Sequence, residues 1–149
     1  MRIALASDHG GYRLKTKIIH YLRKQGWDCL DLGTDSEESV DYPDYALKAA
    51  LAVKNGECQR GIICCGTGVG VAITANKVPG IRAALCHDVF TAHACREHND
   101  ANILTLGQRV IGSGLALEIV KVWLTTEFEE GERHSRRLEK IQAIENGIK

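Results

Sequence analysis

The sequence is poor in aromatic residues, has no excess of either charge and contains no long hydrophobic run. Aromatic residues make up 5% of its 149 residues, and 19 Lys and Arg balance 19 Asp and Glu. Without a net basic field or aromatics interleaved with basic residues, nucleic acid binding is not expected, and a charged ligand must be held by a local cluster. No apolar stretch approaches the ~20 residues of a membrane span or the ~7–15 of a signal core, which predicts a cytoplasmic protein without membrane contact.

The composition is that of an ordinary globular chain, with 44% hydrophobic and 26% charged residues. The length matches one domain on the usual range of ~100–200 residues, so we expect a single domain over residues 1–149. Disulfide frameworks are typical of short secreted chains with little core, and we therefore expect reduced thiols. The cysteines are Cys29, Cys58, Cys64, Cys65, Cys86 and Cys95.

Short apolar runs alternate with helical patterns along the chain. The runs at 3–6, 27–32, 62–65, 81–85 and 103–106 have the near-continuous apolar character of buried parallel strands. Helices are predicted between them and after the last, over about 14–25, 43–55, 71–75, 88–97 and 113–124, from the apolar spacing and from terminal signals. This alternation predicts an α/β fold with a five-stranded parallel sheet, covered on both faces through right-handed crossovers.

One further amphipathic helix follows the helix of the last strand. Leu138, Ile141 and Ile144, together with Ile148, line one face of a segment over about 133–147. Such a helix packs either on its own domain or as an arm over a partner subunit, and we favour the arm.

Reactive side chains follow several strands, in the loops where open parallel sheets bind ligands. Asp8 and His9 follow the first strand, and Cys65 and a glycine-rich loop (Gly66-Thr67-Gly68-Val69-Gly70) follow the third. Later loops carry Cys86, His87, Asp88, Gln108 and Arg109. The successive amides of the glycine loop suit a phosphate, a carboxylate or a developing oxyanion. Its G-x-G-x-G spacing after the third strand is not that of a dinucleotide-binding fingerprint.

Cys65 directly precedes those amides, which favours a thiolate that can act as nucleophile or base. Side-chain alternation places Cys64 on the other face of its strand, as a core residue. A cysteine phosphatase would need an arginine six positions after Cys65, where Val71 stands. Adjacent cysteines do not form an ordinary disulfide. Proton abstraction, which needs a base and nearby oxyanion donors, remains.

Histidines and arginines supply the other candidate groups. His87, His93 and His98 with Cys86 and Cys95 form no recognised metal-ligand spacing, so no metal is expected. We interpret His98 as an acid or base at the mouth of the fifth strand, with Asn99 beside it. Arg133 and Arg137 share a helical face and can clamp a phosphate. Together these groups imply a phosphorylated substrate that loses a carbon-bound proton.

Four segments carry a resemblance to a known family. They are IALASDHGGYRLK, ICCGTGVGVAITANKVPGIRAAL, AHACREHNDANILTLGQRVIG and GERHSRR. The chain resembles the type B ribose 5-phosphate isomerases almost from end to end, in the family that also contains galactose 6-phosphate isomerase subunits. Some relatives carry a glutamate where Val71 stands, so this chain resembles the group with a cysteine base.

The resemblance implies a Rossmann-like three-layer α/β/α sandwich that forms a homodimer, or a tetramer, with active sites shared between subunits and no metal or organic cofactor. It assigns Cys65 as the base that moves a proton between C2 and C1 through a cis-enediolate, and His98 as the residue that opens the furanose ring with help from Asp8. Thr67 and the amides of Gly66, Gly68, Val69 and Gly70 would stabilise the oxygens of that intermediate. The other implied substrate contacts are His9, Asn99, Arg109, Arg133 and Arg137.

We expect an isomerase that interconverts D-ribose 5-phosphate and D-ribulose 5-phosphate. The alternatives are an isomerase of allose 6-phosphate or galactose 6-phosphate, and a non-catalytic sugar-phosphate sensor on the same fold.

Overall fold

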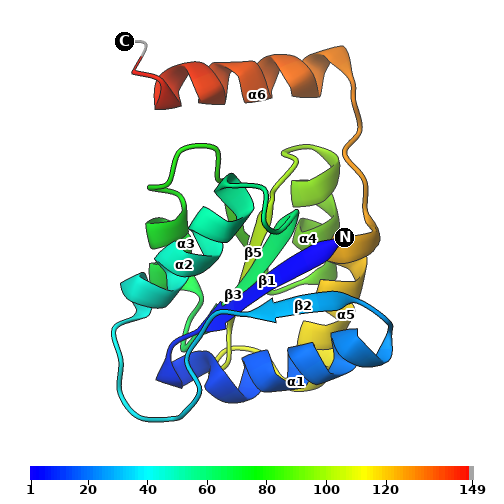
Figure 1. The fold of residues 1–149 in the computed structure, drawn as a ribbon. Helices are drawn as coiled ribbons and strands as arrows, with labels where there is room; N and C mark the ends of the chain where they lie inside the picture. The colour runs from blue at the N-terminus through cyan, green and yellow to red at the C-terminus, as the bar shows by residue number, and fades with distance from the viewer. Residues whose placement is uncertain (148–149) are drawn as a thin grey trace.

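The computed structural model describes residues 1–147 as an α/β fold (Figure 1). The strands are β1 (Arg2–Ser7), β2 (Asp28–Asp31), β3 (Arg60–Cys65), β4 (Ala83–Leu85) and β5 (Ile103–Gly107). The helices are α1 (Tyr12–Lys24), α2 (Tyr42–Lys54), α3 (Val69–Ala75), α4 (Val89–Glu97), α5 (Ser113–Thr125) and α6 (Glu132–Glu145), and a 3-10 turn, His9–Gly11, precedes α1. Over residues 1–147, no helix has the length and apolar character required to cross a membrane.

The five strands are all parallel and lie in the order β2-β1-β3-β5-β4. This confirms the predicted parallel α/β sheet and the Rossmann-like arrangement. The chain leaves β1 toward β2 and then returns across β1 to β3, so the loops after β1 and β3 diverge to opposite faces of the sheet. In open parallel sheets, this divergence creates the crevice in which ligands bind.

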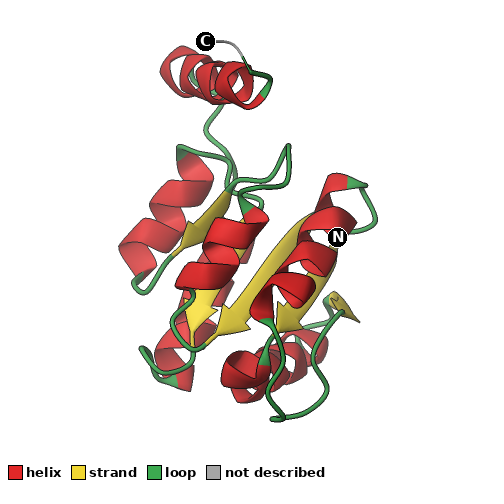
Figure 2. Ribbon diagram, turned by 90° about the vertical axis from the view of Figure 1, so that its left-hand side faces the viewer, coloured by secondary structure: helices red, strands yellow, loops and turns green. Residues whose placement is uncertain are grey.

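Two apolar cores fill the space between the sheet and its helices. One core joins α1, α4 and α5 to one face of the sheet, and the other joins α2 and α3 to the opposite face. Figure 2 shows the strands enclosed by these helices, with α6 set apart from both layers. Successive strand residues alternate between the cores: Ile62 and Cys64 belong to the first, and Ile63 and Cys65 to the second. The pleat therefore separates the adjacent cysteines, as predicted.

Helix α3 begins at Val69, two residues before the predicted start. Gly68 has a φ of 77°, a left-handed conformation that glycine adopts without steric cost, and the chain turns there directly into the helix. The sequence pattern underestimated the helix because Gly70 breaks its apolar run, although Gly70 lies inside the first turn.

Helix α6 crosses the edge of the sheet at which the strands begin, which we call the amino edge (Figure 1). Its first turn lies at the end of α4, and near its other end the carboxylate of Glu145 accepts a hydrogen bond from Gly80 N at 2.9 Å. Ile141 and Ile144 of the predicted apolar stripe are exposed, while Leu138 is half-buried. Ile148 lies outside the described residues. The packing of this stripe on a partner subunit stays a prediction.

Candidate active site

The loop after β1 is pressed against the end of β3. The side chain of Asp8, 7% exposed, accepts a hydrogen bond from Gly11 N at 3.1 Å and so caps the 3-10 turn that follows. A Cβ on Gly11 would overlap the backbone carbonyl of Cys64 and lie 2.7 Å from its Cβ, and a Cβ on Gly10 would lie 3.1 Å from Gly66 N. The Gly10-Gly11 pair therefore allows the Asp8 loop to contact the glycine loop directly.

This close approach predicts a large stability loss for Gly11→Ala. The added methyl group meets rigid backbone, so we expect the free energy of unfolding to fall by about 3 kcal/mol. Urea denaturation at one protein concentration measures the change. Gly114→Ala is the matched control, because a Cβ there meets nothing within 4 Å, and alanine in a helix should raise stability by up to ~1 kcal/mol. Equal effects of the two variants would contradict the packing argument.

His9 is oriented by the loop that follows β2. Its Nδ1 accepts a hydrogen bond from the backbone N–H of Val40 at 3.1 Å. Because an amide only donates, this contact places the proton of the neutral imidazole on Nε2. In this tautomer, Nε2 remains available as a hydrogen-bond donor for a further contact.

Cys65 lies at the end of β3 with its sulfur turned toward the glycine loop. Its Sγ accepts a hydrogen bond from Gly68 N at 3.0 Å, and the residue is 5% exposed. This contact holds the sulfur against the first amides of the glycine loop. Cys64, by contrast, is fully buried in the core beneath α1, and burial raises the pKa of its thiol. The two neighbouring thiols therefore differ in both environment and access.

Two side chains from other elements lie against the glycine loop. Arg109, after β5, packs on Gly66, where a Cβ would lie 3.0 Å from its Nη1. Arg109 N also donates to Gly66 O at 3.0 Å. Tyr42, at the start of α2, lies over Gly70, where a Cβ would lie 2.7 Å from its Cζ. A larger residue at either glycine would displace the cation or the phenol.

Two other loop residues identified from the sequence have structural contacts. Gln108 Oε1 accepts a hydrogen bond from Leu14 N at 2.9 Å, which satisfies an amide in the first turn of α1. His87 Nε2 accepts from Gly107 N at 3.0 Å, and burial lowers the pKa of this imidazole, so it is held neutral. Both residues therefore fix the ends of the strands around the loops that carry Cys65 and Arg109.

His98 and Asn99 lie at the opposite edge of the sheet. His98 follows α4 directly and precedes β5, so it stands at the amino edge and not at the carboxyl end of the fifth strand. The prediction of a position at the mouth of that strand was wrong. A helix that connects two parallel strands returns the chain to their starting edge, and α4 does so here. The length of β5, roughly 15 Å at about 3.3 Å per residue, separates His98 from the level of Cys65.

The first turn of α6 completes a cluster at the amino edge. The rings of His98 and His134 stack with centroids 4.6 Å apart and planes 10° from parallel. Arg133 Nη2 lies 3.4 Å from His134 Nε2, and the Glu129 carboxylate lies 3.7 Å from the same nitrogen. Arg133 and Arg137 are exposed on α6, as expected for groups available to a ligand.

The ligand atoms of His98, Glu129 and His134 all lie within 4.8 Å of one another. This is the donor set of many zinc sites. One feature disfavours a cation here: the Arg133 guanidinium lies 3.4 Å from His134 Nε2 and adds positive charge to the cluster.

The predicted site residues thus fall into two groups. The carboxyl-edge half-site comprises Asp8, His9, Cys65, Gly66, Thr67, Gly68, Val69, Gly70 and Arg109. The amino-edge half-site comprises His98, Asn99, Arg133 and Arg137. Each half-site is compact, but the two lie on opposite edges of the same sheet. Within one chain, they cannot contact a common small molecule.

Sequence reasoning missed Tyr42 and His134, which the structure brings into contact with predicted site residues. Tyr42 stands one residue before the predicted helix over 43–55, and no spacing in the sequence links it to Gly70. His134 stands between the two predicted arginines and is the one buried residue of α6 within the described chain. A histidine that is the one buried residue of its helix is a signal that appears only once burial is known.

A Rossmann-like sheet with a thiol, anion-binding amides and an arginine at its carboxyl edge defines a class of proteins that act on small phosphorylated or carboxylated molecules. The ribose/galactose isomerase family model matches residues 3–141. The chain belongs to this family and is accordingly an isomerase.

The relatives agree along nearly the whole chain. Ribose-5-phosphate isomerase B of Escherichia coli is 49% identical over 144 residues, covering 97% of this chain and 96% of its own. A solved structure of ribose-5-phosphate isomerase B from Clostridium thermocellum has a TM-score of 0.97 at 57% identity and covers 100% of both chains. D-erythrulose-4-phosphate isomerase of Pectobacterium atrosepticum is 45% identical, covering 98% of this chain and 96% of its own. The family is therefore certain, and its members are named for sugar phosphates of different chain length.

Proposed function

We propose that this isomerase interconverts D-ribose 5-phosphate and D-ribulose 5-phosphate, with Cys65 as the base. The observation that supports the proposal is the hydrogen bond from Gly68 N to Cys65 Sγ at 3.0 Å, which puts the sulfur next to the amides of the glycine loop. The names of the Escherichia coli and Clostridium thermocellum relatives support ribose 5-phosphate as the substrate.

The chemistry follows from the charge that each step creates. The Cys65 thiolate takes the proton from C2 of the open-chain aldose, and the electron pair of the C–H bond forms the C1–C2 double bond of a cis-enediolate with one negative charge on O1. Amides of Gly66 to Gly70 and the Thr67 hydroxyl donate hydrogen bonds to the enediolate oxygens. The thiol then returns the proton to C1, while the hydroxyl proton on O2 passes to O1, so that C2 becomes the ketone and C1 carries the alcohol. No electron leaves the sugar, so no redox cofactor is required.

Binding energy from the phosphate would hold C1 and C2 at the base. Arg109 packs on Gly66 within the carboxyl-edge half-site and is a suitable cation for this contact. Arg133 and Arg137 would hold the phosphate from the amino-edge half-site, and His98 would open the furanose ring. Asp8 would assist that opening, while His9 and Asn99 would contact sugar oxygens.

Because the two half-sites cannot meet within one chain, we infer that a second copy supplies the amino-edge residues. Exposed apolar side chains next to the glycine loop support this inference: Val69 and Ile73 of α3 are 51% and 57% exposed, and Phe90 of α4 is 79% exposed. The exposed Ile141 and Ile144 of α6 are a further apolar surface for a partner. In a homodimer with a two-fold axis, the carboxyl-edge half-site of each subunit would meet the amino-edge half-site of the other, which gives two complete sites. A tetramer would consist of two such dimers.

The substrate is tested by assaying the purified protein on a panel of sugar phosphates in the presence of EDTA. We expect ribulose 5-phosphate to form from ribose 5-phosphate at ~1 s⁻¹ or faster, with the same rate when EDTA is omitted. If allose 6-phosphate, galactose 6-phosphate or D-erythrulose 4-phosphate were turned over faster, the proposed substrate would be wrong, but the proposed aldose-ketose isomerisation would stand. Binding of every sugar phosphate without turnover would identify a sensor, and a rate that EDTA abolishes would contradict a metal-free reaction.

A further inference from the structure

The turn between α4 and β5 carries the only non-glycine residue with a positive φ within residues 1–147. Asp100 has a φ of 46° and follows directly on His98 and Asn99. This left-handed conformation is unfavourable for most residues with a Cβ, but aspartate tolerates it, and here hydrogen bonds to the Asp100 side chain and carbonyl fix it. The contacts that hold Asp100 therefore bear on the backbone conformation of the neighbouring residues His98 and Asn99.

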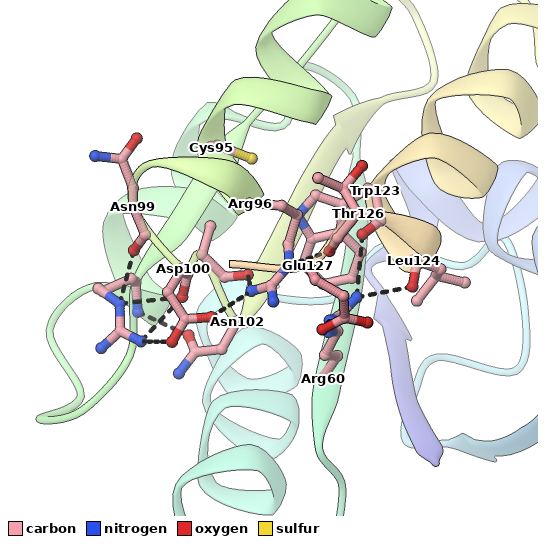
Figure 3. A network of polar contacts seen from close by, with 12 residues as sticks. Arg60, Cys95, Arg96, Asn99, Asp100, Asn102, Trp123, Leu124, Thr126 and Glu127 are labelled. Atoms are coloured by element: carbon pink, nitrogen blue, oxygen red, sulfur yellow. Dashed lines mark hydrogen bonds and ion pairs between the residues drawn. The ribbon is translucent and has the colours of Figure 1, made fainter. Parts of the chain in front are cut away.

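Two arginines clamp the turn from different directions, as part of the network in Figure 3. Arg96 Nη1 donates to Asp100 Oδ1 at 2.8 Å and to Ala101 O at 2.6 Å. Arg82 Nη2 donates to Asp100 Oδ2 at 3.0 Å and to Asp100 O at 2.9 Å. Arg82 Nε also donates to Asn99 O at 3.0 Å. Each carboxylate oxygen thus has its own guanidinium, and the carbonyl groups of the turn are held as well.

The same network reaches the segment that leads to α6. Arg96 is 4% exposed, and its Nε donates to Thr126 O at 3.3 Å. Arg60 is also buried; its Nη1 donates to Leu124 O at 2.9 Å, and its Nη2 lies 3.7 Å from Glu127. Figure 3 shows these groups joining the end of α5 to the turn at Asp100. The network therefore connects the two parts of the amino-edge half-site, which are the His98 turn and the arm.

We propose that Asp100, held between Arg96 and Arg82, is a positioning residue that sets the orientation of His98 and Asn99 for ring opening. A carboxylate is required because only an anion with two acceptor oxygens engages both guanidinium groups at once. Asp100 does not itself reach the reacting atoms in this arrangement. The inference rests on the proposed ring-opening function of His98.

Substrate chemistry provides a measurement that separates positioning from general stability. Ribose 5-phosphate is a furanose, because O4 closes on C1, and it must be opened before C2 can lose its proton. Ribulose 5-phosphate has its C5 hydroxyl esterified and is acyclic, so its conversion needs no ring opening. In the reverse direction, the open-chain aldose can leave the enzyme and close in solution. A defect at His98 should therefore lower kcat at saturating ribose 5-phosphate far more than kcat at saturating ribulose 5-phosphate, while the equilibrium constant keeps the ratio of the two kcat/KM values unchanged. A destabilised fold would slow both directions alike.

The test compares Asp100→Gly with Asp28→Asn in both directions. Glycine accepts the positive φ without strain but removes the carboxylate that binds the two arginines. Asp28 is a control because it lies on the outer strand β2, where it forms an exposed ion pair with Arg2 of the neighbouring strand β1. We expect Asp100→Gly to lower kcat on ribose 5-phosphate by ~10–100-fold, with less than ~3-fold change on ribulose 5-phosphate and a circular dichroism spectrum like that of the wild type. Asp28→Asn should leave both rates unchanged. Asp100→Asn, which keeps the shape and tolerates the turn, carries the test if the glycine variant fails to fold.

Equal losses in both directions, or no loss, would overturn the positioning inference. His98→Asn in the same assay separates this failure from that of the proposed function. If His98→Asn shows the directional loss and the Asp100 variants do not, only the inference on Asp100 falls. If His98→Asn leaves the ratio of the two kcat values at saturation unchanged, the ring-opening assignment falls and the inference falls with it.

Discussion

Replacing Cys65 by alanine is expected to lower turnover of ribose 5-phosphate by ~10³-fold or more while leaving the fold intact. Cys65 Sγ lies against the glycine-loop amides through its hydrogen bond from Gly68 N, whereas the Asp8 carboxylate caps the 3-10 turn at Gly11 N. Alanine removes the base but keeps the loop amides and Arg109, so sugar-phosphate binding should persist. Coupled spectrophotometric assay measures the rate, and calorimetric titration with ribose 5-phosphate measures binding.

The neighbouring thiol provides the control for this substitution. Cys64→Ala removes a sulfur one residue away, on the other face of β3, where it contacts the core beneath α1. We expect it to retain turnover within ~3-fold and to lose about 1 kcal/mol of stability through the small cavity. If Cys64→Ala were the inactive variant and Cys65→Ala the active one, the assignment of the base would be wrong.

Mixing two inactive variants is expected to restore activity. A Cys65→Ala subunit retains an intact amino-edge half-site, and a His98→Asn subunit retains an intact carboxyl-edge half-site. In a dimer of one of each, one site lacks both groups and the other has both. An equimolar mixture refolded together should therefore recover up to about a quarter of wild-type turnover on ribose 5-phosphate.

The restoration depends on exchange of subunits. Variants mixed without unfolding should regain activity slowly, or only after dissociation, and a mixture of Cys65→Ala with a Cys65→Ala, His98→Asn double variant should stay inactive. If the jointly refolded mixture of the single variants also stays inactive while its subunits associate, both half-sites would have to act within one chain. The placement of His98 at the amino edge would then need a large rearrangement.

The parallel sheet, the strand positions and the separation of Cys64 from Cys65 could be predicted because each depends on local patterns. Near-continuous apolar runs predict buried parallel strands, and the period of two along a strand decides which face a side chain occupies. The residues after β1 and β3 were recognised for the same reason, since a loop that follows a parallel strand lies at the carboxyl edge.

His98, Tyr42 and Asp100 show where such reasoning ends. His98 was placed at the wrong edge because proximity to β5 in sequence does not say which end of the strand is near. Tyr42 contacts Gly70 through the packing of α2 against α3, and no spacing encodes that contact. Aspartate tolerates the positive φ of Asp100, but the contact with Arg82, which lies 18 residues away in sequence, is not visible in any local pattern.

The sequence by itself determined the α/β class, the loop that carries Cys65 and the family to which the chain belongs, since these depend on local periodicity and ordered motifs. Only the tertiary structure decided that the predicted site residues form two half-sites on opposite edges of the sheet, and that His134 stacks on His98. The physical reason is that periodicity fixes the face a side chain occupies. The edge it reaches depends on the direction in which each helix returns the chain, and the contacts it makes depend on long-range packing.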